Sequence, residues 1–215
     1  NEESLSYDLA RIKSANAVVS GGYLKLQVKE ESASGRSYTS AYIDSIGKFS
    51  QRYGLWQCRA KINTVPNVSK GIWPAPLWLR GDSAPGEIDI VELRGREPNR
   101  LIASAHGPGY SGAASKSGIK LAPTSLADGF HVYAIEWNVN KITWFLDGKV
   151  VHTLTPASVK PHSYVFNQDF FLILNVAMGG DFDGGLLDTS IQKAEMKVDY
   201  IRYYAIKGVG KVTNK

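Results

Sequence analysis

The sequence has little cysteine, no long apolar run and no cluster of basic residues, and each shortage excludes a class of protein. Cys58 is the single cysteine among 215 residues, so no internal disulfide can form, and its strand-like surroundings predict a small buried side chain. No apolar run approaches the roughly 20 residues that a membrane-spanning helix needs. The 25 Lys and Arg residues are scattered, so the net charge of +5 does not indicate a nucleic-acid partner.

The remaining composition is that of one globular domain covering residues 1–215. Hydrophobic residues make up 43% of the chain, which is enough for a sizeable core. Short alternating runs are separated by turn signals, with no repeat and no linker, and this pattern predicts an all-β sandwich. Residues 170–178 are apolar apart from Asn175 and predict a central strand, whereas the polar tail at 207–215 is expected to fray.

The segment Glu87–Glu92 mixes three carboxylates with three β-branched residues. The β-branched residues predict a strand, in which Glu87 and Asp89 share one face. Strict alternation would turn Glu92 towards the core without a partner, which is costly. A β-bulge of one extra residue near 90–91 removes this conflict and returns Glu92 to the acidic face.

A row of carboxylates on one strand face fits the chemistry of glycoside hydrolysis. Retaining enzymes hold a nucleophilic carboxylate about 5 to 5.5 Å from a carboxyl group that protonates the leaving oxygen and later deprotonates water. The Cα atoms of Glu87 and Glu92 would lie about 13 Å apart along a bulged strand, and side chains leaning inward from a concave strand would narrow this gap. The charge of Asp89 between them would keep a neighbouring glutamic acid protonated.

The pattern Glu87-x-Asp-x-x-Glu92 resembles the active-site signature of glycoside hydrolase family 16, in the longer version of the laminarinases, which are endo-1,3-β-glucanases. Further segments stand in the family's order, among them Trp73-Pro-Ala-x-x-Trp78, Gly95-Arg-Glu-Pro-Asn99, His106-Gly-Pro-Gly-Tyr-Ser-Gly112 and Val198-Asp-Tyr200. The resemblance implies a jelly-roll sandwich of two curved antiparallel sheets, like concanavalin A, with an open concave cleft. A first family strand is not recognisable in residues 1–20.

The resemblance also implies roles for single residues. Glu87 would be the nucleophile and Glu92 the acid/base, with Asp89 supporting both, in a retaining reaction that needs no cofactor. Relatives often hold a structural calcium ion on the convex side, and Asp199 with the backbone of Gly22 are the nearest matches for it here. The residues expected to bind or orient sugar are Trp73, Trp78, Arg59, His106, Trp137 and Asn175.

Some of these positions have a physical interpretation as well. Tryptophan suits the apolar faces of sugar rings, so Trp73, Trp78 and Trp137 are expected to contact substrate, whereas Trp144 is expected in the core. By resemblance, Arg59 faces the cleft near the acids.

His106 and Asn175 are polar residues on predicted strands. His106 lies on the strand expected to pair with 87–92, where it would orient Asp89 or Glu92 and tune its pKa. Asn175 stands alone among apolar residues and must find a partner, for which a substrate hydroxyl is favoured over backbone.

Two other functions remain open. A non-catalytic glucan-binding protein on the same fold would tend to lose the glutamates, and all three acids are present here. A licheninase, agarase or carrageenase would differ in the loops that select the sugar, and the loop after His106 favours a laminarinase. The expected partner is a β-1,3-glucan, with no nucleic acid or membrane. The protein is expected to be a monomer and, by resemblance, secreted, although no signal peptide is seen in the chain.

Overall fold

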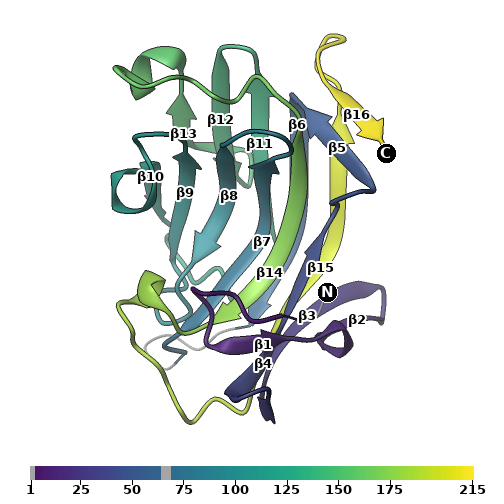
Figure 1. The fold of residues 1–215 in the computed structure, drawn as a ribbon, viewed down its shortest axis with the longest axis vertical. Helices are drawn as coiled ribbons and strands as arrows, with labels where there is room; N and C mark the ends of the chain where they lie inside the picture. The colour runs from purple at the N-terminus through teal and green to yellow at the C-terminus, as the bar shows by residue number, and fades with distance from the viewer. Residues whose placement is uncertain (1–2, 64–68) are drawn as a thin grey trace.

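The computed structural model describes residues 3–63 and 69–215, and its strands form two curved layers (Figure 1). One layer, called the cleft sheet below, carries the candidate site. It contains β10 (Lys116–Leu121), β9 (Arg100–His106), β8 (Glu87–Leu93), β7 (Ile72–Gly81) and β14 (Phe170–Met178), with β5 (Phe49–Arg52) beside β14 and β16 (Lys211–Asn214) beside β5. Strand β14 therefore pairs with β7, which lies about a hundred residues earlier in the sequence, as Figure 1 shows.

The second layer, called the outer sheet, covers the back of the cleft sheet. It contains β3 (Tyr23–Ala33), β15 (Lys193–Tyr204), β6 (Gly54–Asn63), β11 (His131–Asn138), β12 (Lys141–Leu146) and β13 (Lys149–Leu154), with β2 (Ala17–Ser20) on β3. The strand β4 (Arg36–Asp44) joins the layers, because its first half pairs with β3 and residues 41–44 pair with β14. The predicted all-β jelly roll of two curved antiparallel sheets is confirmed.

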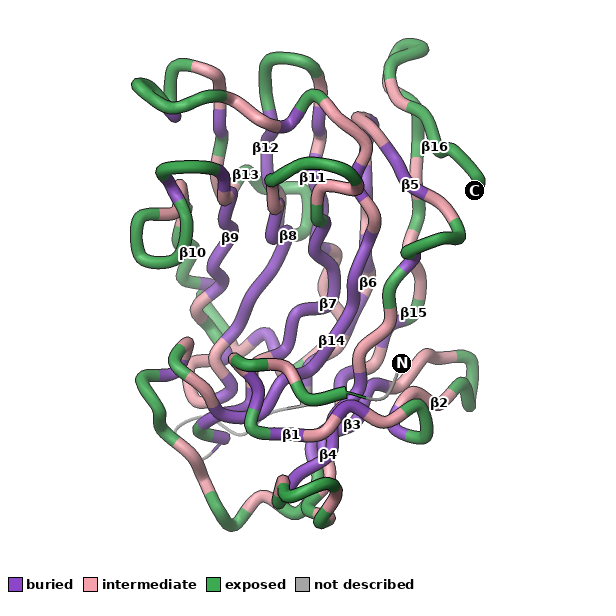
Figure 2. The backbone as a smooth tube through the Cα atoms, in the orientation of Figure 1, coloured by how far each residue is buried: buried purple, intermediate pink, exposed green. Residues whose placement is uncertain are grey.

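An apolar core fills the space between the sheets, and the central strands are buried along most of their length (Figure 2). Cys58 is wholly buried there, as predicted, and its Sγ lies 3.7 Å from the carbonyl oxygen of Pro76 on β7. Helical structure is limited to short 3-10 turns: η1 (Ser14–Asn16), η2 (Gly112–Ala114), η3 (Pro156–Val159) and η4 (Asp181–Asp183). None of the helices in the described part of the chain has the length and apolar character to cross a membrane.

The N-terminal residues are ordered against the cleft sheet. The strand β1 (Ala10–Ile12) pairs with β4, and the buried carboxylate of Asp8 accepts hydrogen bonds from the N–H groups of Ala10 and Met178 and from the Ser40 hydroxyl. The segment passes so close to Gly180, at φ 84°, that a Cβ there would lie 2.1 Å from the carbonyl oxygen of Tyr7. Only glycine fits that approach.

The C-terminal tail differs from expectation. Residues 211–214 do not fray but pair with β5 in register from Lys211 opposite Arg52 to Asn214 opposite Phe49. The Lys215 ammonium group also pairs with the carboxylate of Asp82. The side chains of β16 are exposed, and a strand at a sheet edge needs only backbone hydrogen bonds, so its apolar pattern is too weak to predict it.

Candidate active site

The catalytic strand β8 carries the predicted bulge. Asp89 pairs with Ser104 and Glu92 pairs with Ile102, so two residues of β8 lie opposite one residue of β9. The register against β7 shifts at the same place. The extra residue turns Glu92 back to the face of Glu87 and Asp89, and all three carboxylates line one pocket of about 270 Å³.

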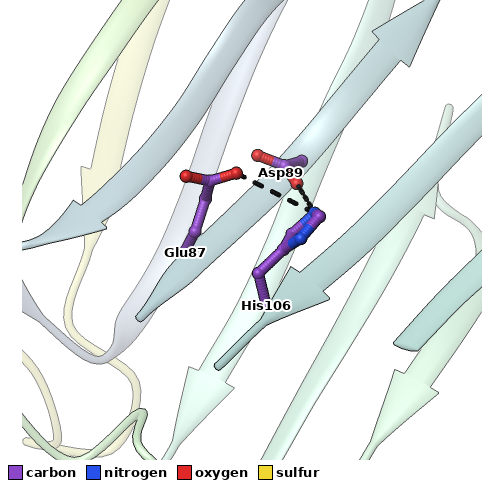
Figure 3. Close-up of side chains that lie close together, drawn as sticks. All are labelled: Glu87, Asp89 and His106. Atoms are coloured by element: carbon purple, nitrogen blue, oxygen red, sulfur yellow. Dashed lines mark ion pairs between the residues drawn. The ribbon is translucent and has the colours of Figure 1, made fainter. Parts of the chain in front are cut away.

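Two of the acids approach a histidine (Figure 3). His106 on β9 lies directly opposite Glu87, and its Nε2 is 2.9 Å from Oδ2 of Asp89 and 3.8 Å from Oε1 of Glu87. The short contact with Asp89 is not aligned as a hydrogen bond, so Oδ2 can accept a further donor. The predicted contact between His106 and Asp89 is confirmed.

The other ring nitrogen of His106 fixes the position of its proton. The backbone N–H of Gly112 donates a 3.2 Å hydrogen bond to Nδ1, which therefore carries a lone pair. In the neutral ring the proton is then on Nε2, facing the acids. Ligand atoms of Glu87, Asp89 and His106 lie within 4.8 Å of one another, but a metal ion would need the Nε2 lone pair. The tautomer therefore suits proton chemistry better than metal binding.

Burial controls the protonation of two of the acids. Asp89 and Glu92 are among the buried charged residues of the chain. Burial is the largest cause that raises the pKa of Glu92 well above its usual range; the charge of Asp89 raises it further, and His106 opposes the shift. Burial, followed by the charge of Glu87, likewise raises the pKa of Asp89. The predicted like-charge effect on Glu92 is present but second to desolvation.

Glu87 occupies a more open position. Its side chain is 31% exposed, and Nε of Arg80 lies 3.7 Å from its Oε2. Glu87 lines not only the 270 Å³ pocket but also a hollow of about 280 Å³ towards Pro85 and Pro108, and one of about 550 Å³ towards Arg94. The three hollows therefore meet at Glu87 and form one groove across the cleft sheet.

Besides His106, three residues predicted to bind or orient sugar lie in this groove. Trp73, Trp78 and Asn175 line the same pocket as the acids. The indole N–H of Trp78 donates a 2.9 Å hydrogen bond to Oδ1 of Asn175, so the partner of that oxygen is neither backbone nor substrate. The Nε1 of Trp73 is buried with no hydrogen-bond partner among the described residues. Sugar binding by these side chains stays a prediction.

The prediction that Trp137 stacks on sugar is wrong. Its side chain is wholly buried, its indole N–H donates a 3.0 Å hydrogen bond to the carbonyl of Phe166, and its ring packs edge-on against Tyr53 and Phe170. Trp137 lies on the same strand face as Ile135, which is also wholly buried. Alternation along β11 therefore carries it into the core.

The predictions for Arg59, and for calcium at Asp199 and Gly22, also need correction. Cys58 points into the core, so Arg59 points outward from the outer sheet, away from the cleft. Its guanidinium lies over the Phe130 ring, and Nη1 is 2.5 Å from Oδ2 of Asp199. A cation at Asp199 would have to displace this guanidinium, so the residues present do not fit a calcium site.

Sequence reasoning missed several residues of the groove wall. The ring of Phe182 stacks on Trp73 at 4.4 Å, and Tyr7 lies 5.6 Å from Trp73 on its other edge. Arg94 donates a 2.8 Å hydrogen bond to the carbonyl of Phe182 and lies over its ring. These residues lie in or beside loops, where no periodic pattern indicates which side chains face the groove. Phe182, an aromatic residue shortly after the pair Gly179-Gly180, was the one available signal.

Comparison with known proteins places the chain among carbohydrate-active enzymes. The family model described as "Glycosyl hydrolases family 16" matches residues 6–202. A β-glucanase of Rhodothermus marinus is 35% identical over 95% of this chain and 74% of its own length. A solved laminarinase catalytic domain from Thermotoga petrophila has a TM-score of 0.86 and 36% identity, covering 93% of this chain and 84% of that one.

A longer relative extends the comparison. The glucan endo-1,3-β-glucosidase A1 of Niallia circulans is 33% identical over 88% of this chain, which spans only 30% of that relative's length. This chain therefore corresponds to one region of that longer protein. Since the family model covers most of the described residues, the chain belongs to glycoside hydrolase family 16 and is a glycoside hydrolase.

Proposed function

We propose that this glycoside hydrolase cuts β-1,3-glucans such as laminarin within the chain and with retention of configuration. The observation that carries the proposal is the position of Glu87 where three hollows meet, because a polymer lying in the groove would extend past the nucleophile in both directions. The β-glucanase and laminarinase names of the relatives support the choice of substrate.

In the first half of the reaction, the Glu87 carboxylate attacks the anomeric carbon of the sugar in the groove. Glu92 donates its proton to the glycosidic oxygen as the bond breaks, and the half of the glucan that carries the new hydroxyl leaves. Burial suits Glu92 to this task, because a raised pKa favours the protonated form that can donate.

In the second half, Glu92 is a carboxylate and takes a proton from water. The water oxygen attacks the same anomeric carbon, the bond to Glu87 breaks, and Glu92 is protonated again. Two inversions at one carbon leave the product with the configuration of the substrate. No cofactor is required by this scheme.

His106 and Asp89 support the two glutamates. His106 directs its Nε2 towards Asp89 and Glu87, and a small rotation of the side chains would let it donate a hydrogen bond that orients one of these carboxylates. The charge of Asp89 opposes ionisation of Glu92 until the proton is needed. Trp73, backed by Phe182, offers an aromatic surface for a sugar ring beside the acids.

The first experiment is reducing-sugar release from laminarin, lichenan, agarose and carrageenan by the wild type and Glu87→Ser. We expect release to be fastest from laminarin and to fall by several orders of magnitude in Glu87→Ser. The matched control is Glu136→Ser, a half-buried glutamate on β11 of the outer sheet, which should act like the wild type.

Four outcomes would contradict the proposal. Faster release from lichenan, agarose or carrageenan would indicate a sister activity. Laminarin binding without release would indicate a glucan-binding protein. Near-normal turnover by Glu87→Ser would remove Glu87 as nucleophile, and an α-anomer as the first product in proton NMR would exclude retention.

We also propose that the enzyme acts outside the cell, because a glucan polymer is too large to cross a membrane unaided. Activity found in the washed cells of its source and not in the medium would contradict this.

A further inference from the structure

Trp144 links the outer sheet to the catalytic strand. Its side chain is wholly buried on β12, and its indole N–H donates a 2.9 Å hydrogen bond across the core to the backbone carbonyl of Asp89 on β8. The bond is thus made by a core residue of one sheet to the backbone of the other, behind the row of acids.

The acceptor of this bond stands at the beginning of the bulge. Asp89 is the last residue of β8 that pairs in regular register with β9, and the pairing resumes only at Glu92. Against β7 the shift also follows Asp89. A bulge disrupts the ladder, and a buried carbonyl that loses its ladder partner needs another donor. Trp144 supplies that donor.

We propose that Trp144 is a positioning residue that fixes the bulge of β8 and thereby the placement of Glu92, in the reaction proposed above. Glu87 precedes the bulge and lies in the regular part of the ladder, opposite His106. Glu92 follows the bulge, so its position relative to Glu87 depends on how the backbone of residues 90–91 is held. Loss of the indole donor should therefore affect the acid and leave the nucleophile in place.

Trp137 offers a matched control, because its indole is buried and hydrogen-bonded like that of Trp144 but makes no hydrogen bond to the catalytic strand. Both indoles are wholly buried in the core, and both donate to a backbone carbonyl, at 3.0 Å for Trp137. The carbonyl that Trp137 binds belongs to Phe166, outside the catalytic strand. A general effect of losing one buried indole donor should appear equally in both.

The test replaces each tryptophan by phenylalanine and, separately, by 3-benzothienylalanine, which keeps the shape of the indole and lacks the N–H. Two substrates are compared: laminarin, whose sugar leaving group needs a proton, and 2,4-dinitrophenyl β-laminaribioside, whose phenolate leaves without one. The first turnover of the aryl substrate reports the attack by Glu87 alone. The benzothienyl variants keep the comparison valid if phenylalanine prevents folding.

For the Trp144 variants we expect kcat on laminarin to fall about 10- to 100-fold, since a full loss of general acid catalysis costs about 10²- to 10⁴-fold. The first-turnover rate on the aryl substrate should change less than about threefold, and the Trp137 variants should change both rates less than about threefold, since only the acid is displaced. Equal losses on the two substrates, or equal losses in the Trp137 variants, would overturn the proposal.

A readout without substrate separates this inference from the proposed function. Carbon NMR of the labelled Glu92 carboxyl should give a titration midpoint that moves in the Trp144 variants by at least half a pH unit and stays fixed in the Trp137 variants. An unmoved midpoint in the Trp144 variants would overturn the inference. A wild type that cleaves neither substrate would overturn the proposed function, and the titration would still decide the role of Trp144.

Discussion

Glu92 meets two opposing requirements at one side chain. In the proposed reaction it must be protonated when the glycosidic bond breaks and ionised when water is activated, yet burial penalises the ionised form. Its folded-state pKa is raised above that of the unfolded chain, so the folded state holds the proton over a pH range where the unfolded state releases it. The contribution of Glu92 to the free energy of unfolding is therefore fully present below the pKa of the unfolded state. It is lost as pH rises through the pKa of the folded state.

Replacement of Glu92 by Gln should separate these effects. We expect Glu92→Gln to raise Tm at pH 8 by a few degrees, roughly 2 to 4 °C per kcal/mol of relieved penalty, because Gln stays neutral. The gain should shrink as pH falls and vanish at roughly pH 3, well below the ordinary pKa of a glutamic acid, where Glu92 is protonated in both states. Activity on laminarin should fall about 10²- to 10⁴-fold. Calorimetry at both pH values checks the first part, and a lower Tm at pH 8 would contradict the burial argument.

The pH profile of the wild type offers a second check on Glu92. The alkaline limb of kcat/KM should lie above the usual range of a glutamic acid, because attack requires Glu92 protonated and burial raises its pKa. The rate should decline as pH rises through that limb. An alkaline limb at the ordinary pKa of an exposed glutamate, measured with laminarin, would contradict this.

Among the structural elements, the short turn η4 forms one wall of the groove, and the buried carboxylate of Asp183 anchors it together with the contacts of Arg94. Asp183 accepts a 2.7 Å hydrogen bond from Nε of Arg96 and a 3.0 Å hydrogen bond from the N–H of Gly71. These bonds fix the turn that places Phe182 on Trp73. Phe182 therefore reaches the groove through the anchoring of its neighbour.

Replacement of Asp183 by Ala should loosen this wall. We expect stability to fall by about 1–3 kcal/mol, since the N–H of Gly71 loses its partner, and KM for laminarin to rise about tenfold with little change in kcat. Asp188→Ala is the control: its carboxylate accepts hydrogen bonds from nearby Ser190, and its KM should stay near that of the wild type. A fall in kcat with unchanged KM would assign η4 to the chemistry instead of binding.

The elements also explain which site residues the sequence could predict. The bulge followed from one conflict, a carboxylate that strict alternation would bury at Glu92, and the structure resolves the conflict as expected. Alternation also places Trp137 with the buried Ile135 and turns Arg59 away from the buried Cys58, whereas the family resemblance predicts both in the cleft. Local periodicity was the better guide at these two positions.

For the molecule as a whole, the architecture of two curved sheets could be predicted from the sequence, and the groove wall could not. Alternating apolar runs predict strands one at a time, and the family resemblance supplies their stacking into two sheets. Tyr7 and Phe182 reach the groove through contacts between distant parts of the chain, such as the hydrogen bond from the Met178 N–H to Asp8. No pattern within a short window reports such a contact.

At the scale of the whole fold, Asp199 on the outer sheet already has a cationic partner in Arg59, so we expect no calcium ion to stabilise the protein there. We expect a calcium chelator to leave Tm unchanged within about 1 °C, because one kcal/mol of lost stability would shift it by about 2–4 °C. Arg59→Ala should lower stability by at most about 1 kcal/mol, since the pair is partly exposed. A large drop in Tm on chelation would contradict the assignment and indicate a cation elsewhere.

The hydrogen bond between Asp8 and Met178 determines when the groove can form during synthesis of the chain. The side chain that begins near the N-terminus cannot find its partner until residue 178 has left the ribosome, since the hydrogen bond spans 170 positions. The groove, which Tyr7 helps to line, is therefore completed late, after most of the chain has been made. A nascent fragment that stops before β14 would carry Glu87, Asp89 and Glu92 but would lack a complete groove. We therefore expect such a fragment to be inactive on glucan.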